Sequence, residues 1–246
     1  MTQLGLPDSI QACLFDLDGV VTRTAVVHAA AWKETFDAFL SSYEGERGRP
    51  FDEVADYDEY VDGRPRADGV RAFLESRGIH LPEGGPDDPP DASTVHGLGN
   101  RKNVLLLEKI RTGGVEAYEG TLRYLEAVRA AGLRTAIVSS SANCRDVLRS
   151  VGAEHFFDVR VDGVVAAERS LPGKPRPDTF LAAARDLGVE ADRAAVFEDA
   201  LAGMDAGRAG GFGYVVGVDR TGQGEALYAH GASVVVKDLA ELGGKR

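Results

Sequence analysis

Four acidic residues stand in two pairs at the ends of apolar runs. Asp16 and Asp18 follow the first apolar run of the chain, and Glu198 and Asp199 follow a later one. Carboxylate oxygens are the hard ligands that Mg²⁺ prefers, so all four residues are candidate metal ligands. A carboxylate can also attack phosphorus and form an aspartyl-phosphate intermediate, which makes Asp16 the candidate nucleophile. Asp18, two residues further on, can protonate the leaving oxygen and later deprotonate the next acceptor.

Serine and lysine residues in two further segments of the chain are suited to binding a phosphate. Ser139, Ser140 and Ser141 follow another apolar run, and the Ser139 hydroxyl and the amides that begin the next helix can hold phosphate oxygens. Lys174, in a loop, can place a point positive charge against a phosphoryl group. Each feature alone is also typical of a turn, a helix cap or a solvated lysine. Their combination with the acidic pairs indicates phosphoryl transfer by positioning and charge neutralisation.

The elements that would position these groups fall into two parts. A buried strand is predicted within residues 10–20, because a short apolar run ends there at an Asp-Gly turn. No strand is predicted from residue 21 to residue 114. The helices predicted in that stretch are 24–43, 51–63, 68–77 and 100–111, and an exposed loop is predicted at 80–92.

Strands and helices alternate after residue 115. The predicted strands are 133–138, 156–161, 194–197, 214–218 and 233–236, and the predicted helices are 118–131, 142–151, 178–187 and 200–209. Such alternation is typical of a doubly wound parallel sheet, so we expect an α/β fold with an inserted helical domain. The expected domains are residues 1–22 with 116–246, a Rossmann-like catalytic core, and 23–115, the helical insertion. Open parallel sheets bind ligands beyond the carboxyl ends of their strands, where the candidate residues lie.

The composition limits which partners the protein is expected to bind and in which cellular compartment it is expected. The chain has 246 residues, of which 43% are hydrophobic and 27% charged, so it can bury a core without disulfides or structural metals. Its net charge of −11 argues against binding to nucleic acids or anionic membranes. No apolar run approaches the ~18 residues of a membrane span, and no secretory signal is visible. The two cysteines make no disulfide framework, so we expect a reducing cytoplasm, and we also expect a monomer.

The core motifs resemble those of the haloacid dehalogenase-like phosphotransferase superfamily. Asp16-Leu17-Asp18-Gly19 is similar to its first motif, Ser139 to its second, Lys174 to its third and Glu198-Asp199 to its fourth. The resemblance implies Mg²⁺ as cofactor, an aspartyl-phosphate at Asp16 and an acid/base at Asp18. It also identifies the helical insertion as a cap domain. Aspartate at position 18 matches the phosphatases and phosphomutases of the superfamily rather than its dehalogenases.

A finer resemblance is to the β-phosphoglucomutase-like subfamily. Gly63-x-x-Arg66 matches the cap motif whose arginine holds the second phosphate of the substrate. The other residues that match substrate-binding segments of the subfamily are Thr24, His28, Trp32, Lys102, Ser140, Ser141 and Asn143. The resemblance implies a small phosphorylated sugar as substrate, transferred between the 1- and 6-positions of glucose phosphate through glucose 1,6-bisphosphate. Two alternatives stay open: His28 steadies Asp18 or pairs with a neighbour on its helix, and Trp32 contacts sugar or belongs to the core of the cap.

Three departures from the subfamily pattern bear on the second phosphate. Arg23 stands where relatives commonly carry an acid, Asp62 where the mutases commonly have lysine, and Ala142 where a lysine helps to hold the distal phosphate. Two positive charges are therefore missing from the expected phosphate grip. This keeps a sugar-phosphate phosphatase of the same superfamily as an alternative. A non-enzymatic phospho-acceptor domain is a distant alternative, because such domains are shorter, lack the helical insertion and need no acid/base.

Overall fold

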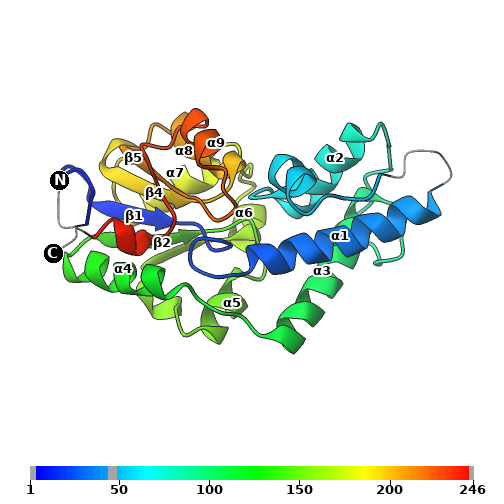
Figure 1. Ribbon diagram of the computed structural model, residues 1–246, viewed down its shortest axis with the longest axis horizontal. Helices are drawn as coiled ribbons and strands as arrows, with labels where there is room; N and C mark the ends of the chain where they lie inside the picture. The colour runs from blue at the N-terminus through cyan, green and yellow to red at the C-terminus, as the bar shows by residue number, and fades with distance from the viewer. Residues whose placement is uncertain (1–3, 44–48, 244–246) are drawn as a thin grey trace. The chain divides into compact units, whose positions relative to one another are not determined.

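Six parallel strands form one sheet in the computed structural model, which describes residues 4–43 and 49–243 (Figure 1). The strands are β1 (Ala12–Phe15), β2 (Arg134–Val138), β3 (Val159–Val161), β4 (Ala194–Glu198), β5 (Tyr214–Val218) and β6 (Val234–Val236). Their order in the sheet is β3-β2-β1-β4-β5-β6, so β1 and β4 are central neighbours. The doubly wound α/β fold predicted from the alternation of strands and helices is therefore confirmed.

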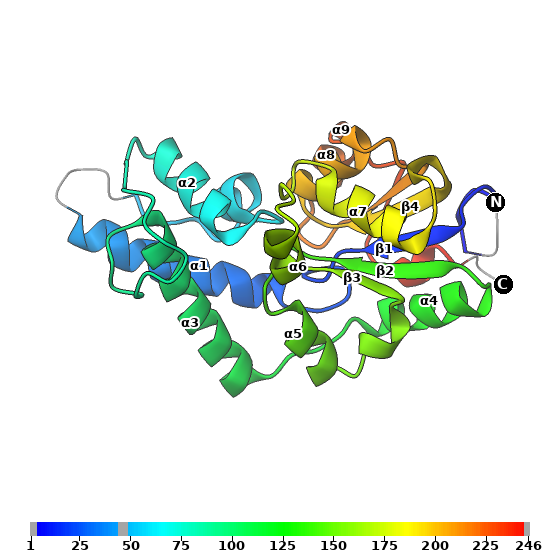
Figure 2. The same cartoon turned by 180° about the vertical axis from the view of Figure 1, so that it is seen from behind.

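Helices cover both faces of the sheet. Helices α4 and α5 lie on one face and α7, α8 and α9 on the other, as the two opposite views agree (Figures 1 and 2). The bounds are α4 (Glu119–Ala130), α5 (Cys144–Ser150), α6 (Gly163–Glu168), α7 (Asp178–Leu187), α8 (Leu201–Ala209) and α9 (Gly224–Ala229). Every residue of β1 and β4 is buried. This is why these strands are continuous apolar runs and do not alternate with polar residues.

The chain divides into two compact units. Residues up to 23 together with those from 115 onward make the α/β unit, and residues 24–114 make the helical unit. The helical unit contains α1 (Ala25–Ser42), a π-helical turn η1 (Tyr57–Val61), α2 (Arg66–Ser76) and α3 (Val95–Gly113). As predicted, it has no strand among its described residues.

An aromatic core holds the helical unit together. The Phe36 ring centroid lies 4.1 Å from that of Phe73, 5.0 Å from that of Trp32 and 5.3 Å from that of Phe51. Trp32 stacks nearly parallel to Phe36 and is only 3% exposed. Burying such rings supplies the main stabilisation that a small helical unit needs. Trp32 therefore belongs to this core.

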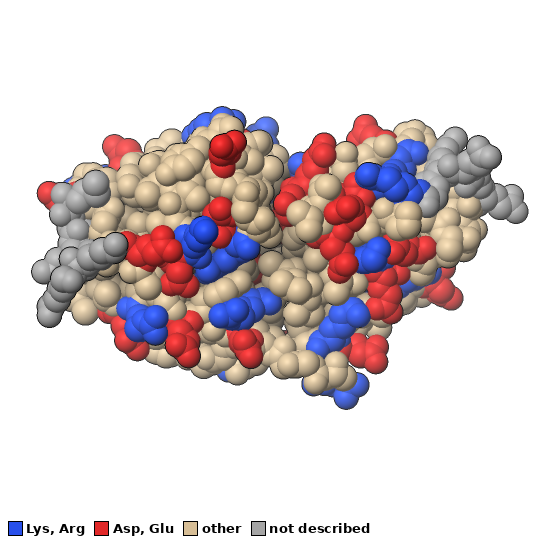
Figure 3. Space-filling model, in the orientation of Figure 1, with Lys and Arg blue, Asp and Glu red and all other residues tan. Residues whose placement is uncertain are grey.

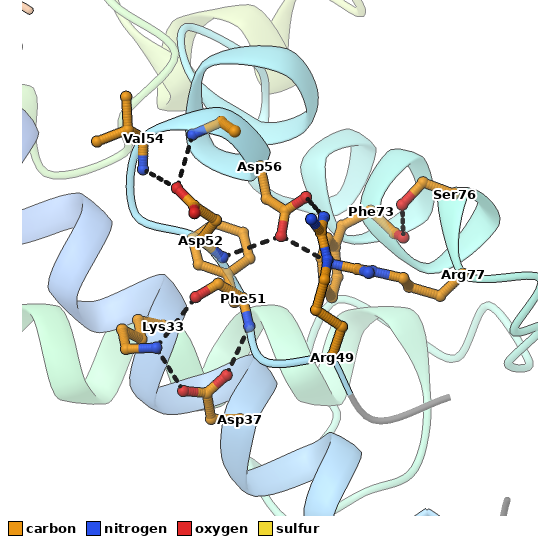
Figure 4. Close-up of polar contacts among 11 residues, drawn as sticks. Lys33, Asp37, Arg49, Phe51, Asp52, Val54, Asp56, Phe73, Ser76 and Arg77 are labelled. Atoms are coloured by element: carbon orange, nitrogen blue, oxygen red, sulfur yellow. Dashed lines mark hydrogen bonds and ion pairs between the residues drawn. The ribbon is translucent and has the colours of Figure 1, made fainter. Parts of the chain in front are cut away.

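A polar network fastens the segment before η1 to helices α1 and α2 (Figure 4). Lys33 on α1 donates to Asp37 at 2.8 Å and to the Phe51 carbonyl at 3.0 Å, and Asp37 accepts from the Phe51 amide at 2.8 Å. Asp56, 2% exposed, accepts from Arg77 at 2.6 Å. Lys33 is thus bonded to partners within its own unit.

The helix predicted at 51–63 is shorter than predicted, because only residues 55–61, which end in η1, are helical. The Asp52 carboxylate accepts from the amides of Val54 and Ala55, each at 2.9 Å. Such side-chain bonds compete with the helical backbone pattern and end or delay a helix. The acidic residue Asp52, which the prediction counted as part of a helix, thus forms a capping turn instead.

Three other elements differ from the predictions. Helix α3 starts at Val95, five residues before the predicted helix at 100, because Thr94 caps it by accepting from the Gly97 amide at 3.0 Å. Helices α6 and α9 were not predicted. Each has six residues, which is too short for a clear repeat of buried positions.

Charged side chains of both signs are interspersed on the face shown in Figure 3. The excess of acidic residues is therefore not collected into one patch on this face. Within the part of the chain that the structure describes, no helix has the length and apolar character to cross a bilayer.

Candidate active site

Lys174 joins the two acidic motifs at the carboxyl ends of β1 and β4. Its Nζ donates to Asp16 Oδ1 at 2.5 Å, to Glu198 Oε1 at 2.6 Å and to the Val138 carbonyl at 3.2 Å. These partners follow or end β1, β4 and β2, which are adjacent in the sheet, and parallel strands end at the same edge. Lys174 is 1% exposed and is therefore a buried cation, not a solvated loop lysine.

Glu198 is held by both of its carboxylate oxygens. While Oε1 accepts from Lys174, Oε2 accepts from the amides of Asp199 and Ala200, each at 3.0 Å. The residue is completely buried. A Cβ atom on Gly203, in the first turn of α8, would lie 1.8 Å from Glu198 Oε1, so only glycine leaves room for this carboxylate. Position 203 is thus part of the site although glycine has no side chain.

The carboxylates outnumber the cations at this point of the fold. Burial opposes the charge of Lys174, but Asp16 and Glu198 outweigh burial and raise the pKa of Lys174 above its ordinary value. Burial raises the pKa of Asp16 well above its ordinary value although Lys174 lowers it, and the charges of Glu198 and Asp18 act in the same direction as burial. Burial is thus the largest cause of the raised pKa of Asp16, whereas the neighbouring carboxylates cause the raised pKa of Lys174.

Asp16, Glu198 and Asp199 form a group suited to a divalent cation. One ligand oxygen from each lies within 4.8 Å of the others, and all three residues are buried. Three carboxylates against the single ammonium of Lys174 leave a surplus of two negative charges, which a divalent ion would neutralise. Carboxylate oxygens are the donors that Mg²⁺ prefers, so the residues present fit this ion. The Asp18 carboxylate is not a member of the group, and its assignment as a metal ligand stays a prediction.

A tight turn places Asp18 directly after β1. Val21 and Thr22 both donate their amides to the Leu17 carbonyl at 2.9 Å, and the Gly19 amide donates to the Thr22 carbonyl at 2.8 Å. Gly19 has φ +86°, and a Cβ atom there would lie 1.6 Å from Asp199 Oδ2. Both the left-handed backbone and the close approach require glycine. The turn therefore packs the candidate acid/base segment against a candidate metal ligand.

The serine loop after β2 is ordered by its own hydroxyls. Ser139 Oγ accepts from the Ser141 amide at 3.1 Å, and Ser141 Oγ accepts from the Asn143 amide at 3.2 Å. Ser139 is 2% exposed, and Asn143 is the residue that precedes α5. Lys174 reaches the carbonyl of Val138, the residue before this loop. Ser139 therefore lies in the same group of strand ends as Asp16 and Glu198.

Lys102 contacts two other predicted residues of the helical unit, His28 and Trp32. Lys102 Nζ lies 3.0 Å from His28 Nδ1 and 4.9 Å from the centre of the Trp32 ring. Because an ammonium only donates, His28 Nδ1 is the acceptor in its contact with Lys102. Lys102 is 4% exposed. His28 thus pairs within its own unit, and the role of steadying Asp18 stays a prediction.

Arg66 is held at the start of α2 by helix α3. Its guanidinium donates to the Gly99 carbonyl at 3.3 Å and to Asn100 Oδ1 at 3.2 Å, and burial lowers its pKa. The Asn100 amide group donates in turn to the carbonyls of Pro86 and Asp88, at 2.9 and 2.8 Å. The loop predicted at 80–92 is therefore packed against the residue that orients Arg66. Gly63, with φ +69°, makes the bend that precedes α2, and Thr24, 1% exposed, precedes α1.

Known proteins share this arrangement over almost the whole chain. A family model described as a haloacid dehalogenase-like hydrolase matches residues 10–211. The chain belongs to the haloacid dehalogenase-like hydrolase family. A protein of Mycobacterium bovis named beta-phosphoglucomutase is 58% identical over 245 residues, covering 97% of this chain and 94% of that protein.

More distant relatives agree with this family. A beta-phosphoglucomutase of Bacillus subtilis is 31% identical, covering 95% of this chain and 92% of that protein. The crystal structure of a beta-phosphoglucomutase from Clostridium difficile has a TM-score of 0.74 and 26% identity, covering 95% of this chain and 93% of that one. Haloacid dehalogenase-like enzymes typically use Mg²⁺, which agrees with the buried acidic group.

Sequence reasoning missed three residues that contact the candidate site: Gly203, Arg220 and Gln223. Gly203 makes room for Glu198, and its only signal in the sequence is a glycine inside a predicted helix. Arg220 donates to the Gly19 carbonyl at 2.8 Å, and Gln223 donates to the Asp199 carbonyl at 3.2 Å. These two follow β5, so the rule that strand ends carry function would have found them had it been applied to that strand.

Proposed function

We propose that this protein is a Mg²⁺-dependent β-phosphoglucomutase that converts β-glucose 1-phosphate into glucose 6-phosphate. The observation that carries the proposal is 58% identity, over nearly the whole chain, to a protein of that name. The buried group of Asp16, Lys174, Glu198 and Asp199 supports it, because it pairs the candidate nucleophile with a buried cation and with further carboxylates. We further propose a monomer that acts in the cytoplasm.

The chemistry of the proposal follows from the contacts at the strand ends. Asp16 attacks phosphorus and becomes an aspartyl-phosphate, while Lys174 restricts rotation of its carboxylate and neutralises charge on the phosphoryl oxygens. Asp18 protonates the sugar oxygen that leaves and later takes the proton from the hydroxyl of the next acceptor. Asp16, Glu198 and Asp199, together with Asp18, would hold Mg²⁺, which supplies positive charge against the transferring phosphoryl group when bound.

Other residues would hold the rest of the substrate. The loop proposed to bind the transferring phosphate contains Ser139, Ser140, Ser141 and Asn143. Arg66 is the proposed ligand of the second phosphate, because a guanidinium binds phosphate with two parallel hydrogen bonds. The remaining proposed substrate-binding residues are Thr24, His28, Trp32, Gly63 and Lys102. Glucose 1,6-bisphosphate is the proposed intermediate and activator, formed when the aspartyl-phosphate passes its group to glucose phosphate.

Phosphorus NMR tests the proposal directly. We expect β-glucose 1-phosphate, with the protein, Mg²⁺ and a catalytic amount of glucose 1,6-bisphosphate, to give glucose 6-phosphate. The α-anomer is the substrate control and Asp16→Asn the protein control, and both should give no product. If inorganic phosphate is the only product, the protein is a sugar-phosphate phosphatase. That outcome would trace to Asp62 and Ala142, the positions where lysines of the mutases are replaced.

A further inference from the structure

The loop that follows β5 touches the backbone of two site residues within the α/β unit. Arg220 Nε donates to the Gly19 carbonyl at 2.8 Å, and Gln223 Nε2 donates to the Asp199 carbonyl at 3.2 Å. The loop is itself ordered, because Asp219 Oδ1 accepts from the amides of Gly222 at 2.7 Å and Gln223 at 2.9 Å. One short segment thus supports both the turn after β1 and the turn after β4.

The Arg220 side chain is held in place from three directions. Its guanidinium carbon lies 3.5 Å from the centre of the Tyr118 ring, and Nη1 donates to the Lys237 carbonyl at 2.6 Å. Nε reaches Gly19 on the remaining side. A guanidinium stacked on an aromatic ring and bonded at two nitrogens has little freedom to move. Arg220 therefore presents a fixed donor to the turn.

The contact between Arg220 and the Gly19 carbonyl bears on Asp18, the residue before Gly19. The Gly19 amide is bonded to the Thr22 carbonyl at 2.8 Å, while its carbonyl is bonded to Arg220, so both of its backbone polar groups are fixed. Asp18 immediately precedes this glycine. Because Gly19 has φ +86°, it is the most permissive residue of the turn, and a bond to its carbonyl limits how far the turn can rotate. The direction of the Asp18 side chain depends on that rotation.

We propose that Arg220 is a positioning residue that holds Asp18 in the orientation required for proton transfer to and from the sugar oxygen. The inference rests on the proposed function, because it requires Asp18 to be the acid/base. Arg220 touches neither the metal group nor the serine loop among the contacts described. Its loss should therefore harm the proton-transfer part of the reaction and spare attack by Asp16.

Two substrates distinguish proton transfer by Asp18 from attack by Asp16. Transfer from β-glucose 1-phosphate needs a proton on the leaving sugar oxygen, whereas p-nitrophenolate leaves without one. We expect Arg220→Met to slow conversion of β-glucose 1-phosphate by ~10–100-fold. The pre-steady-state burst of p-nitrophenolate, which reports phosphorylation of Asp16, should stay within about twofold of the wild type. Arg220→Lys, which keeps the charge and one donor, should recover part of the sugar-phosphate rate.

Controls distinguish failure of this inference from failure of the proposed function. At Mg²⁺ concentrations that saturate each variant, Asp18→Asn should show the same selective loss, and Arg208→Met, which removes an exposed arginine of α8, should change neither rate. If Asp18→Asn is not selective at saturating Mg²⁺, the acid/base assignment itself is wrong. If Asp18→Asn is selective but Arg220→Met changes both rates equally, or neither, the positioning role is overturned. If Arg220→Met does not fold, Arg220→Lys decides: a selective loss supports the role, and equal or absent losses refute it.

Discussion

Replacing Gly203 with alanine should damage the site although the substitution is conservative and the residue lies in a helix. The added Cβ would stand 1.8 Å from Glu198 Oε1 and 1.9 Å from its Cδ. Oε1 is the end of a side chain, but it cannot simply swing away. Lys174 and the amides of Asp199 and Ala200 hold the carboxylate at 2.6, 3.0 and 3.0 Å.

The magnitude follows from the bonds that Glu198 must give up. Glu198 is fully buried, and breaking a buried ion pair typically costs ~3–5 kcal/mol because the other charge is left without its partner. Alanine is favoured over glycine in a helix interior by ~1 kcal/mol, which offsets part of that loss. We therefore expect Gly203→Ala to lower the free energy of unfolding by ~2–4 kcal/mol. Mg²⁺ binding should weaken as well, because Glu198 is one of its proposed ligands.

Urea denaturation and calorimetric titration with Mg²⁺ measure the two effects. Gly207→Ala in the same helix is the matched control, because a Cβ there would meet only valine side chains, at 3.3 Å or more. In a Glu198→Ala background, Gly203→Ala should become neutral or stabilising by up to ~1 kcal/mol, since the obstructing carboxylate is gone. An unchanged urea midpoint and Mg²⁺ affinity for Gly203→Ala would refute the argument. An equal destabilisation with and without Glu198 would refute it too.

Three further predictions concern pH, metal and substrate. Burial and the nearby Asp52 raise the pKa of Asp58 to about 6, so wild-type stability should fall as pH rises from about 4 to about 6. Asp58→Asn should then add ~1 kcal/mol to the free energy of unfolding at pH 7, a value reduced for partial exposure, and nothing below pH 4, as urea denaturation at several pH values would show. EDTA should abolish turnover and added Mg²⁺ restore it in a coupled assay, and activity that survives EDTA would exclude an essential metal. Arg66→Ala should reduce kcat/KM for β-glucose 1-phosphate ~10- to 100-fold more than for p-nitrophenyl phosphate, whereas equal losses would exclude a role in binding the second phosphate.

The position of the site could be predicted from the sequence because parallel strands impose a simple rule. Apolar runs that end in Asp16, Ser139 and Glu198 must become buried strands, and the carboxyl ends of parallel strands lie at one edge. The prediction of helices failed where the chain has no strong repeat of buried positions. Helices α6 and α9 are short, and the segment before η1 follows side-chain hydrogen bonds that composition does not reveal.

Residue types and their order along the chain determined the fold class, the position of the acidic pairs and the kind of chemistry they support. Only the tertiary structure decided how these groups are paired. Lys174 is far from Asp16 and Glu198 in the sequence, yet packing buries all three and brings them within hydrogen-bonding distance. Gly203 and Arg220 joined the site in the same way, one by leaving space and the other by reaching a backbone carbonyl. Contacts of this kind depend on distances across the fold, and a linear pattern of residue types does not contain those distances.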